Sequence, residues 1–455
     1  MKESVEIIKK ITAAGGVAVL AGGCVRDMIL GNIPNDYDIA TNFTPDQIID
    51  LFSADENINV VLVGKQFGVI TLFFHKEQKI YEIATFRRDS NTSDGRRPDS
   101  VEFSSIEEDA LRRDFTINGM FYDPVDEKFI DFIGGMDDLE NHTIRFIGNA
   151  QERIDEDYLR IIRAIRFSIK FDFTLTPGAE IAIRNNLHQL KNVSIERIHD
   201  ELNKIFLSAC KLGKLSKAIE ILDEYKILDM FIPEVSAMKG VEQPAEFHPE
   251  GDVFVHVLKV LDNLPNDSSI ELIWGTLLHD IGKPPTMTVT DRIRFNNHDM
   301  VGEKMARKRL TELKFSNDQI DHICCLIHHH MNFRFVQEMK DSTLKRLMRV
   351  HRFDEHLLLH RADCLGSFGG LDNFHFASQK FEDWQEEDPT QVTDGFKAFI
   401  NGNDLISWGF KPGPSFKVVL QIIEDKQLDG EITSKEEAEI LARKIMENRD
   451  ELSVL

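Results

Sequence analysis

Asp36 and Asp38 are separated by a single residue in the segment NDYDIAT. Positions i and i+2 of a strand point to the same face, so the two carboxylates would repel each other unless a divalent cation lies between them. Mg²⁺ takes such carboxylates together with substrate phosphates as its ligands. The pair therefore predicts a Mg²⁺ site for phosphoryl or nucleotidyl transfer by two metal ions. A solvated loop is the alternative for an isolated D-x-D.

A pair of glycines precedes the two aspartates. Residues 17–20 form a short apolar run, typical of a strand, that stops at Gly22 and Gly23, and a helix carrying Arg26 is expected to follow. Glycines let the backbone approach a phosphate closely, and the N-terminus of a helix adds partial positive charge. We predict a phosphate-binding turn here, with an ordinary turn as the alternative.

The order of strand, Gly-Gly, Arg-Asp helix and D-x-D resembles the catalytic motif of the DNA polymerase beta-type nucleotidyltransferases. In detail it is similar to the bacterial-type (class II) tRNA nucleotidyltransferase (CCA-adding) and poly(A) polymerase family. The resemblance, which continues through most of the chain, implies template-independent addition of CCA to tRNA from CTP and ATP. It makes Asp36 and Asp38 the catalytic residues and the ligands of Mg²⁺. Glu82, in KIYEIATFR, is a candidate third carboxylate, and a solvated strand residue is the alternative.

The segment LRRDFTIN, residues 111–118, is expected to begin a helix. Guanidinium groups bind phosphate oxygens in a bidentate manner. By resemblance, this segment contacts the sugar and triphosphate of the incoming nucleotide through Arg113, with Asp114 or Asn118 at a ribose hydroxyl. The acidic neighbours at 107–109 leave a solvated helix face as the alternative. A mobile loop is expected at residues 94–98, between strands.

Another motif, Glu156-Asp157-Tyr158-Leu159-Arg160, is expected to open a helix, on which an ion pair between Asp157 and Arg160 would be ordinary. Cytosine and adenine both present an amine donor beside a ring-nitrogen acceptor, whereas uracil and guanine present the reverse order. A carboxylate and a guanidinium on one helical turn would therefore accept C and A and reject U and G. The segment matches E-D-x-x-R, the amino-acid template of the family that the chain resembles.

Basic residues continue along the same expected helix. Arg163 is assigned to the nucleotide together with Glu156, while Arg166 and Lys170 extend a stripe near the expected path of an RNA end. Arg197 lies in SIERI, which resembles a helix-stabilising motif of the family. We predict a structural role for this segment, with Arg197 as a candidate phosphate contact.

Histidines and aspartates recur through a later helical segment, and both side-chain types suit several first-row metals. Their pattern, H…HD…D, resembles that of the HD phosphohydrolase superfamily, with these residues at its positions: His256, His279, Asp280 and Asp363. The resemblance implies a second divalent metal, namely Ni²⁺, Mn²⁺, Co²⁺ or Mg²⁺, and hydrolysis of a phosphate ester at an RNA end. His298 and the run at 328–330 are further histidines to which the sequence assigns no ligand role.

The 455 residues contain 54 Lys and Arg against 77 Asp and Glu, a formal net charge of −23. Non-specific coating of nucleic acid rests on phosphate neutralisation, so the charge disfavours that class but permits a nucleic-acid enzyme with a local basic groove. No apolar run approaches the roughly 20 residues that span a bilayer, and the N-terminus resembles neither a signal nor a transit peptide. Five scattered cysteines argue against a disulfide framework. We expect a cytoplasmic enzyme.

The elements that position these residues change along the chain. Helical and strand-like runs alternate to about residue 150, and helical periodicity dominates after it. The predicted class is α+β, in which all-α parts follow a nucleotidyltransferase head with a mixed sheet. The predicted domains are a head at 1–150, a helical RNA-binding neck at 151–234, an HD-type domain at 235–373 and a helical C-terminal body or tail at 374–455.

Three alternative functions stay open. A bacterial-type poly(A) polymerase would share the head motifs, although tracking generic RNA requires a more basic surface. A CC-only or A-only tRNA nucleotidyltransferase would also carry these motifs. An HD phosphohydrolase with a nucleotide-sensing head belongs to a different class, and a sensor needs neither D-x-D nor E-D-x-x-R.

Overall fold

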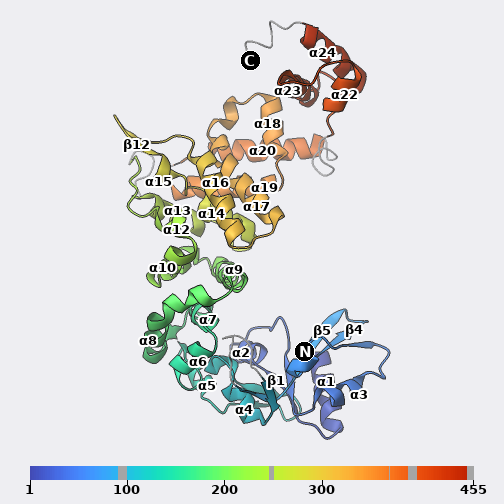
Figure 1. Ribbon diagram of the computed structural model, residues 1–455, viewed down its shortest axis with the longest axis vertical. Helices are drawn as coiled ribbons and strands as arrows, with labels where there is room; N and C mark the ends of the chain where they lie inside the picture. The colour runs from blue at the N-terminus through green and yellow to red at the C-terminus, as the bar shows by residue number, and fades with distance from the viewer. Residues whose placement is uncertain (91–99, 245–250, 368, 388–396, 448–455) are drawn as a thin grey trace. The chain divides into compact units, whose positions relative to one another are not determined.

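The protein is described by a computed structural model that covers residues 1–90, 100–244, 251–367, 369–387 and 397–447 (Figure 1). The chain forms two compact units. One comprises Met1–Ala209 with Glu224–Lys226, and the other comprises Cys210–Asp223 with Ile227–Leu455. The finer division into four domains stays a prediction.

A seven-stranded mixed sheet is the centre of the first unit. Its strands are, in spatial order, β3 (Ile58–Val61), β4 (Val69–Phe74), β5 (Lys79–Thr85), β2 (Ile39–Thr41), β1 (Ala18–Ala21), β8 (Phe121–Asp123) and β9 (Lys128–Ile130). Neighbouring strands are antiparallel except β2 and β5, which are parallel. In the β1–β2 ladder Val19 lies opposite Ala40. The predicted α+β class with a mixed-sheet head is confirmed.

Two amphipathic helices pack on this sheet. α1 (Lys2–Ala13) contacts β1, and α3 (Pro45–Phe52) contacts β4. Apolar residues at helical spacing are buried on each helix, as a core-facing stripe requires: Ile7, Ile8 and Ile11 of α1, and Ile48 and Phe52 of α3. The packing fixes β1, the strand that leads directly into the glycine pair and then into α2 (Gly23–Ile29).

The second motif lies in a turn rather than at the start of a helix. α4 (Ile106–Leu111) ends where the sequence predicted a helix to begin, and the 3-10 turn η2 (Thr116–Asn118) follows. The helix begins earlier because the Ser105 hydroxyl accepts the backbone N–H of Glu108 at 3.3 Å and so caps it. Before α4 lies the hairpin of β6 (Arg87–Ser90) and β7 (Ser100–Phe103). The loop predicted at 94–98 lies outside the described residues.

The helix predicted to open at Glu156 begins three residues later, at Leu159. α6 (Ala150–Glu156) ends before Asp157, and α7 (Leu159–Phe171) begins after Tyr158. Asp157 has an extended backbone, with φ −156° and ψ 105°, and its Oδ1 accepts the backbone N–H of Leu159 at 3.0 Å. This local bond pairs the first backbone N–H of α7, which has no partner within the helix, so the motif forms a junction between two helices.

Short helices and one small ladder complete the first unit. They are the 3-10 helix η1 (Lys65–Phe67), α5 (Gly135–Glu140), α8 (Pro177–Asn186), the 3-10 helix η3 (Leu187–Asn192), and the two-stranded ladder of β10 (Thr143–Ile144) and β11 (Thr174–Leu175). The longer helix α9 (Ile195–Lys211) begins in this unit and ends in the second one. The ladder is a small departure from the purely helical neck that the sequence predicted.

The second unit is almost entirely helical. It contains α10 (Leu215–Glu224), α11 (Ile227–Phe231), α12 (Pro233–Ser236), α13 (Val253–Asp262), α14 (Ile270–Leu278), α15 (Lys283–Thr286), α16 (His298–Glu312), α17 (Asn317–His329), the 3-10 segment η4 (His330–Glu338), α18 (Asp341–Met348), α19 (Phe353–Gly366), α20 (Asp372–Glu387), α22 (Gly402–Ser407), α23 (Ser415–Leu428) and α24 (Lys435–Glu447). The hairpin of β12 (Met287–Val289) and β13 (Ile293–Phe295) was not predicted. α13, α14, α16, α17 and α19 pack in pairs and carry the histidine-rich segment. Among the described helices none has the length and apolar character needed to cross a membrane.

Candidate active site and metal centre

A cavity of about 500 Å³ in the first unit gathers the predicted catalytic and nucleotide-binding residues. Its lining comes from the glycine turn, the D-x-D segment, the R-R-D motif and α7: Gly22, Gly23, Arg26, Asp36, Asp38, Arg112, Arg113, Asp114, Asn118, Asp157, Arg160, Arg163, Arg166, Phe167 and Lys170. Of the predicted nucleotide and RNA contacts, Glu156 and Arg197 lie outside this lining. Arg112 and Phe167 line the cavity without having been assigned to it from the sequence, although Phe167 is four residues after Arg163 and so on the same helix face.

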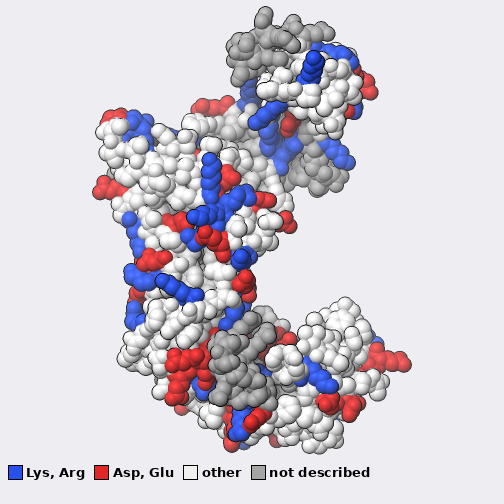
Figure 2. All heavy atoms as spheres, in the orientation of Figure 1, with Lys and Arg blue, Asp and Glu red and all other residues white. Residues whose placement is uncertain are grey.

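The charge of the cavity is opposite to that of the chain. Seven cationic side chains and four carboxylates line it, a formal net charge of +3, whereas the whole chain carries −23. On the face drawn in Figure 2, basic and acidic side chains are interspersed over the described surface. A local concentration of positive charge attracts a polyanion such as a nucleoside triphosphate.

Gly22 is required both by its backbone and by its neighbour. Its φ of +76° is a conformation that favours glycine. A Cβ atom at this position would lie 2.8 Å from Nη1 of Arg113. The glycine therefore leaves room for an arginine side chain at the turn that closes the cavity.

The two aspartates lie just before β2, the central strand of the sheet, rather than within a strand. β2 begins at Ile39, but the carbonyl oxygen of Asp38 already accepts the backbone N–H of Ala21 in β1 at 3.0 Å. Desolvation, then Asp36 and Glu82, raises the pKa of Asp38 to about 6. Two further carboxylates thus act on Asp38, which is the environment that a divalent cation relieves. Glu82 as a third ligand stays a prediction.

The arginines of the cavity are held by polar partners on neighbouring elements. Arg113 donates to Asp109 at 3.0 Å, and Arg26 donates to Oδ1 of Asn118 at 2.5 Å. Arg163 of α7 reaches across to Oδ2 of Asp114 at 2.5 Å. These contacts fix the direction of each guanidinium before a ligand binds.

Asp114 stays ionised within this network. Burial opposes its charged form, but Arg163 and the amide of Asn118 hold the pKa of Asp114 below its usual value. Asn118 donates to Oδ1 of Asp114 at 3.1 Å. An ionised carboxylate only accepts hydrogen bonds, so Asp114 can accept a hydrogen bond from a ribose hydroxyl.

Asp157 and Arg160 each have their own partner and do not form the helical ion pair that the spacing allowed. Asp157 accepts two hydrogen bonds from Arg197 of α9, at 3.1 Å and 2.7 Å. Arg160 donates to Glu156 at 2.5 Å and to the carbonyl oxygen of Arg153 at 2.8 Å. Glu156 therefore supports Arg160 from outside the cavity, and Arg197 holds Asp157 rather than lying free for a phosphate.

The two remaining basic residues of α7, Arg166 and Lys170, differ in burial and in their neighbours. Nε of Arg166 donates to Glu201 at 2.6 Å, in a buried pair. Lys170 is half-buried, and desolvation together with Arg26 lowers its pKa. Both residues line the cavity, and contacts of either one with RNA stay predictions.

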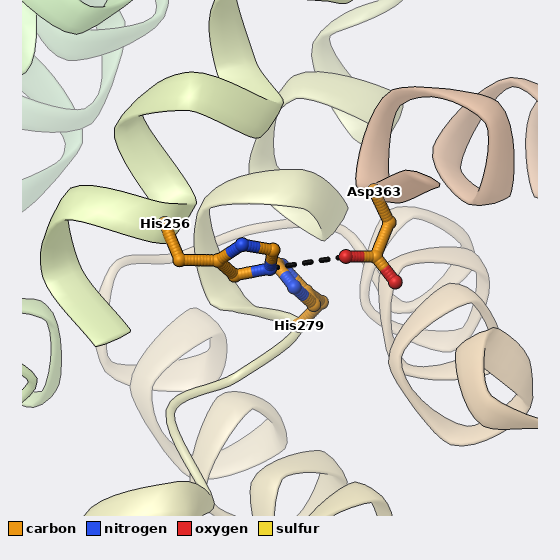
Figure 3. A group of neighbouring side chains, drawn as sticks. All are labelled: His256, His279 and Asp363. Carbon is orange, nitrogen blue, oxygen red and sulfur yellow. Dashed lines mark ion pairs between the residues drawn. The ribbon is translucent and has the colours of Figure 1, made fainter. Parts of the chain in front are cut away.

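In the second unit, the four residues of the H…HD…D pattern come together from two helices and one turn. His256 lies on α13, His279 directly after α14, and Asp363 on α19. Figure 3 shows the His256 ring and the Asp363 carboxylate pointing toward each other, with Nε2 of His256 3.0 Å from Oδ1 of Asp363. One ligand atom of each of the three residues lies within 4.8 Å of the others.

Asp280 adjoins this group from the turn after α14. Its Oδ2 lies 3.2 Å from Nε2 of His279 and 2.7 Å from Nζ of Lys283. Burial opposes ionisation, but the nearby His279 and Lys283 hold the pKa of Asp280 well below its usual range. His298 and His330, to which the sequence assigned no role, lie against the same carboxylate.

The geometry of His279 fits a metal ligand. Its Nδ1–H donates to the carbonyl oxygen of Thr276 at 2.7 Å, which leaves the lone pair on Nε2. Nε2 is buried, and no hydrogen-bond partner in the described part of the chain reaches it. A metal-bound histidine uses its second ring nitrogen in this way.

Comparison with known proteins connects both units to one family. Residues 18–145 match the model of the poly A polymerase head domain, residues 172–239 that of the RNA- and SrmB-binding site of polymerase A, and residues 298–442 that of tRNA nucleotidyltransferase domain 2. A CCA-adding enzyme of Ligilactobacillus salivarius is 30% identical over 98% of this chain and 97% of its own length. Poly(A) polymerase I of Haemophilus influenzae is 34% identical over 52% of each chain. The crystal structure of the Bacillus stearothermophilus CCA-adding enzyme in complex with CTP shares the fold, with a TM-score of 0.71, 24% identity, and coverage of 100% of this chain and 99% of that one.

Proposed function

This chain belongs to the bacterial-type CCA-adding enzyme and poly(A) polymerase family, and from that membership we propose that it adds C, C and A to the 3′ end of tRNA. The nucleotides come from CTP and ATP, and no nucleic-acid template takes part. One observation supports this above all others: a single cavity brings together paired aspartates, phosphate-binding arginines and a carboxylate–guanidinium pair suited to C and A.

The reaction is a nucleotidyl transfer. The 3′-oxygen of the RNA bonds to the α-phosphorus of the nucleotide, the bond to pyrophosphate breaks, and the proton of the 3′-hydroxyl leaves to solvent or a carboxylate. Asp36 and Asp38 would hold Mg²⁺, which would supply activation of the hydroxyl and stabilisation of the negative charge on the leaving pyrophosphate. Arg26 and Arg113 bind the triphosphate, and Asp114 accepts from a ribose hydroxyl.

Base selection rests on Asp157 and Arg160. The Asp157 carboxylate accepts from the exocyclic amine of C or A, and Arg160 donates to the adjacent ring nitrogen. A carboxylate has about four acceptor positions, so Asp157 can accept a hydrogen bond from the amine of the base while Arg197 keeps the carboxylate oriented. Uracil and guanine would place a donor before Arg160 and an acceptor before Asp157, leaving both pairs unmade.

Nucleotide addition to defined tRNA transcripts separates this function from its rivals. A CCA-adding enzyme extends tRNA by C, C and A and stops, a poly(A) polymerase makes long A tails on unrelated RNA, and a CC-only or A-only enzyme extends only one kind of transcript. A nucleotide-sensing head would add nothing.

The second unit supports a second function, metal-dependent hydrolysis of a phosphate ester. The buried Nε2 of His279, which has no hydrogen-bond partner among the described residues and lies beside His256, Asp280 and Asp363, is the observation that favours it. These four residues would hold a divalent ion such as Mn²⁺, Ni²⁺, Co²⁺ or Mg²⁺, which supplies an activated water. Replacing His279 and Asp280 by Ala should abolish hydrolysis of p-nitrophenyl phosphate esters and leave nucleotide addition intact. Wild-type protein that is inactive with all four metals would refute this function.

A further inference from the structure

Asp109 is a buried acidic residue that the nucleotidyl transfer described above does not use. It lies in α4, and its side chain is 1% exposed, whereas Glu107, two residues earlier, is exposed. The sequence left a solvated helix face as the alternative for the acidic residues at 107–109, and the burial of Asp109 excludes that alternative for this residue. A carboxylate is rarely buried unless it is paired, so the role of Asp109 depends on its partners.

Two guanidinium groups share the Asp109 carboxylate. Nε and Nη2 of Arg112 each lie 2.8 Å from Oδ1, and Nε and Nη2 of Arg113 lie 3.3 Å and 3.0 Å from Oδ2. Asp109 precedes the two arginines by three and four residues, the spacings at which side chains meet on one face of a helix. Each arginine therefore binds one carboxylate oxygen through the same edge of its guanidinium group.

A backbone group holds the carboxylate from a second element. The N–H of Arg87, the first residue of β6, donates to Oδ1 of Asp109 at 3.3 Å. The side chain of Arg87 in turn donates to the carbonyl oxygen of Phe67. The two guanidinium groups and this N–H together occupy the roughly four acceptor positions of a carboxylate. The direction of the Asp109 side chain is thus fixed by both α4 and β6.

The two arginines face the nucleotide cavity, and Asp109 lies behind them. Arg112 and Arg113 line the cavity, whereas Asp109 does not contribute to its lining. Nη1 of Arg113 donates to the carbonyl oxygen of Asn118 at 3.3 Å and would lie 2.8 Å from a Cβ atom on Gly22. Asp109 therefore binds the Nε edge of Arg113 and leaves Nη1 at the glycine turn, where we expect a phosphate.

The shared carboxylate also keeps two like charges side by side. Without it the guanidinium groups of Arg112 and Arg113 would repel each other, and each long side chain would regain rotamers that point elsewhere. A triphosphate would then have to order both side chains as it binds, which lowers its affinity. With the carboxylate in place, both arginines are ordered before the nucleotide arrives.

We infer that Asp109 is a positioning residue for the triphosphate of the incoming nucleotide, and that it acts by holding Arg112 and Arg113 in the direction in which they bind phosphate oxygens. The inference deepens the nucleotidyl transfer proposed above and rests on it. Because CTP and ATP carry the same triphosphate, the effect of Asp109 is the same for both nucleotides. Base selection, which rests on Asp157 and Arg160, does not depend on it.

The sign of the effect separates positioning from charge. Asp109→Asn removes a negative charge from behind the cavity, and on charge alone a more positive cavity would bind a polyanion more tightly. Positioning predicts weaker binding, because the amide keeps one acceptor oxygen and turns N–H donors toward a guanidinium group that also has only donors. At least one of the two arginines then loses its partner.

Equilibrium binding of CTP and ATP to the full chain, with Mg²⁺ and without tRNA, tests the inference. We expect Asp109→Asn to raise both Kd values by the same factor of about 10- to 150-fold, the range for loss of one hydrogen bond to a charged group. In nucleotide addition to tRNA, the variant should raise KM more than it lowers kcat and should keep the wild-type ratio of kcat/KM for CTP and UTP. Glu107→Gln is the matched control, because it removes the same charge from the exposed face of the same helix; it should leave both Kd values unchanged.

Tighter or unchanged binding by Asp109→Asn overturns the inference, and so does a change confined to one nucleotide. In an Arg112→Ala, Arg113→Ala background, Asp109→Asn should weaken CTP binding much less than it does in the wild-type chain, and an equal, additive loss also overturns the inference. If Asp109→Asn does not fold, Asp109→Glu decides, since it keeps the charge but displaces both guanidinium groups by one methylene; CTP affinity equal to that of the wild type overturns the inference. A wild-type chain that binds neither CTP nor ATP contradicts the proposed function itself.

Discussion

Replacing Arg197 by Ala tests how the protein reads a base. Arg197 donates two hydrogen bonds to Asp157, at 2.7 Å and 3.1 Å, and the side chains of the pair are 21% and 18% exposed. Without Arg197 the Asp157 carboxylate loses the contact that orients it toward the amine of C or A. We therefore expect the variant to select CTP over UTP less well than the wild-type enzyme.

The geometry sets the size of the effect. A hydrogen bond to a charged group contributes about 1.5–3 kcal/mol, and partial exposure of this pair lowers its value. We expect a loss of about 1–3 kcal/mol in discrimination, which corresponds to a fall of about 5- to 150-fold in the ratio of kcat/KM values for CTP and UTP.

Single-turnover addition to a tRNA that lacks CCA measures this ratio. Arg197→Lys keeps the charge but not the paired hydrogen bonds, so it should lie between wild type and Arg197→Ala. Arg184→Ala is the matched control, because Arg184 forms an exposed pair with Glu180 and Glu224 in the same unit. An unchanged CTP to UTP ratio in Arg197→Ala, with stability preserved, would refute the reasoning.

Further predictions concern the aspartates and the glycine turn. Asp36→Ala or Asp38→Ala should abolish nucleotide addition and leave tRNA binding largely intact in a filter-binding assay. Because the pKa of Asp38 is raised to about 6, the protonated fraction of Asp38 increases as the pH falls through 6. The rate of nucleotide addition should decrease over the same pH range. Excess Mg²⁺ should move the midpoint of this pH profile to lower pH. A pH profile that is flat from 5 to 7 at limiting Mg²⁺ would contradict this role. Gly22→Ala should lower the free energy of unfolding, measured by chemical denaturation, by about 1–3 kcal/mol, because the φ of residue 22 is positive. It should also raise KM for CTP, because the new Cβ atom displaces Arg113. An unchanged KM would show that the displacement has no effect on nucleotide binding.

Several features of the site were predictable because they depend on short sequence patterns. The strand before Gly22, the D-x-D pair and the arginines of the second motif are local signals, and one cavity gathers them. Asp157 and Arg160 also lie in that cavity, as the chemistry of the base edges required. The residue types alone were therefore sufficient to predict most of the residues that line this cavity.

Other features depend on tertiary packing and were not predictable. Helical spacing placed the start of a helix at Glu156, but Glu156 ends α6, the backbone of Asp157 is extended, and α7 begins only at Leu159. The partner of Asp157 is Arg197, forty residues later, and periodicity cannot identify so distant a contact. His298 joins Asp280 only because the glycines of two segments allow their backbones to touch.

Labelled nucleotide addition to three tRNA transcripts, lacking CCA, ending in CC or complete, tests the central claim most directly. The wild-type protein should add two C residues from CTP to the first, one A from ATP to the second and nothing to the third, and UTP and GTP should be poor substrates. Arg160→Ala should weaken selection against UTP and GTP by about 1–3 kcal/mol, because its guanidinium donates to the ring nitrogen that C and A share. Long A tails, or selection that Arg160→Ala leaves unchanged, would contradict the account.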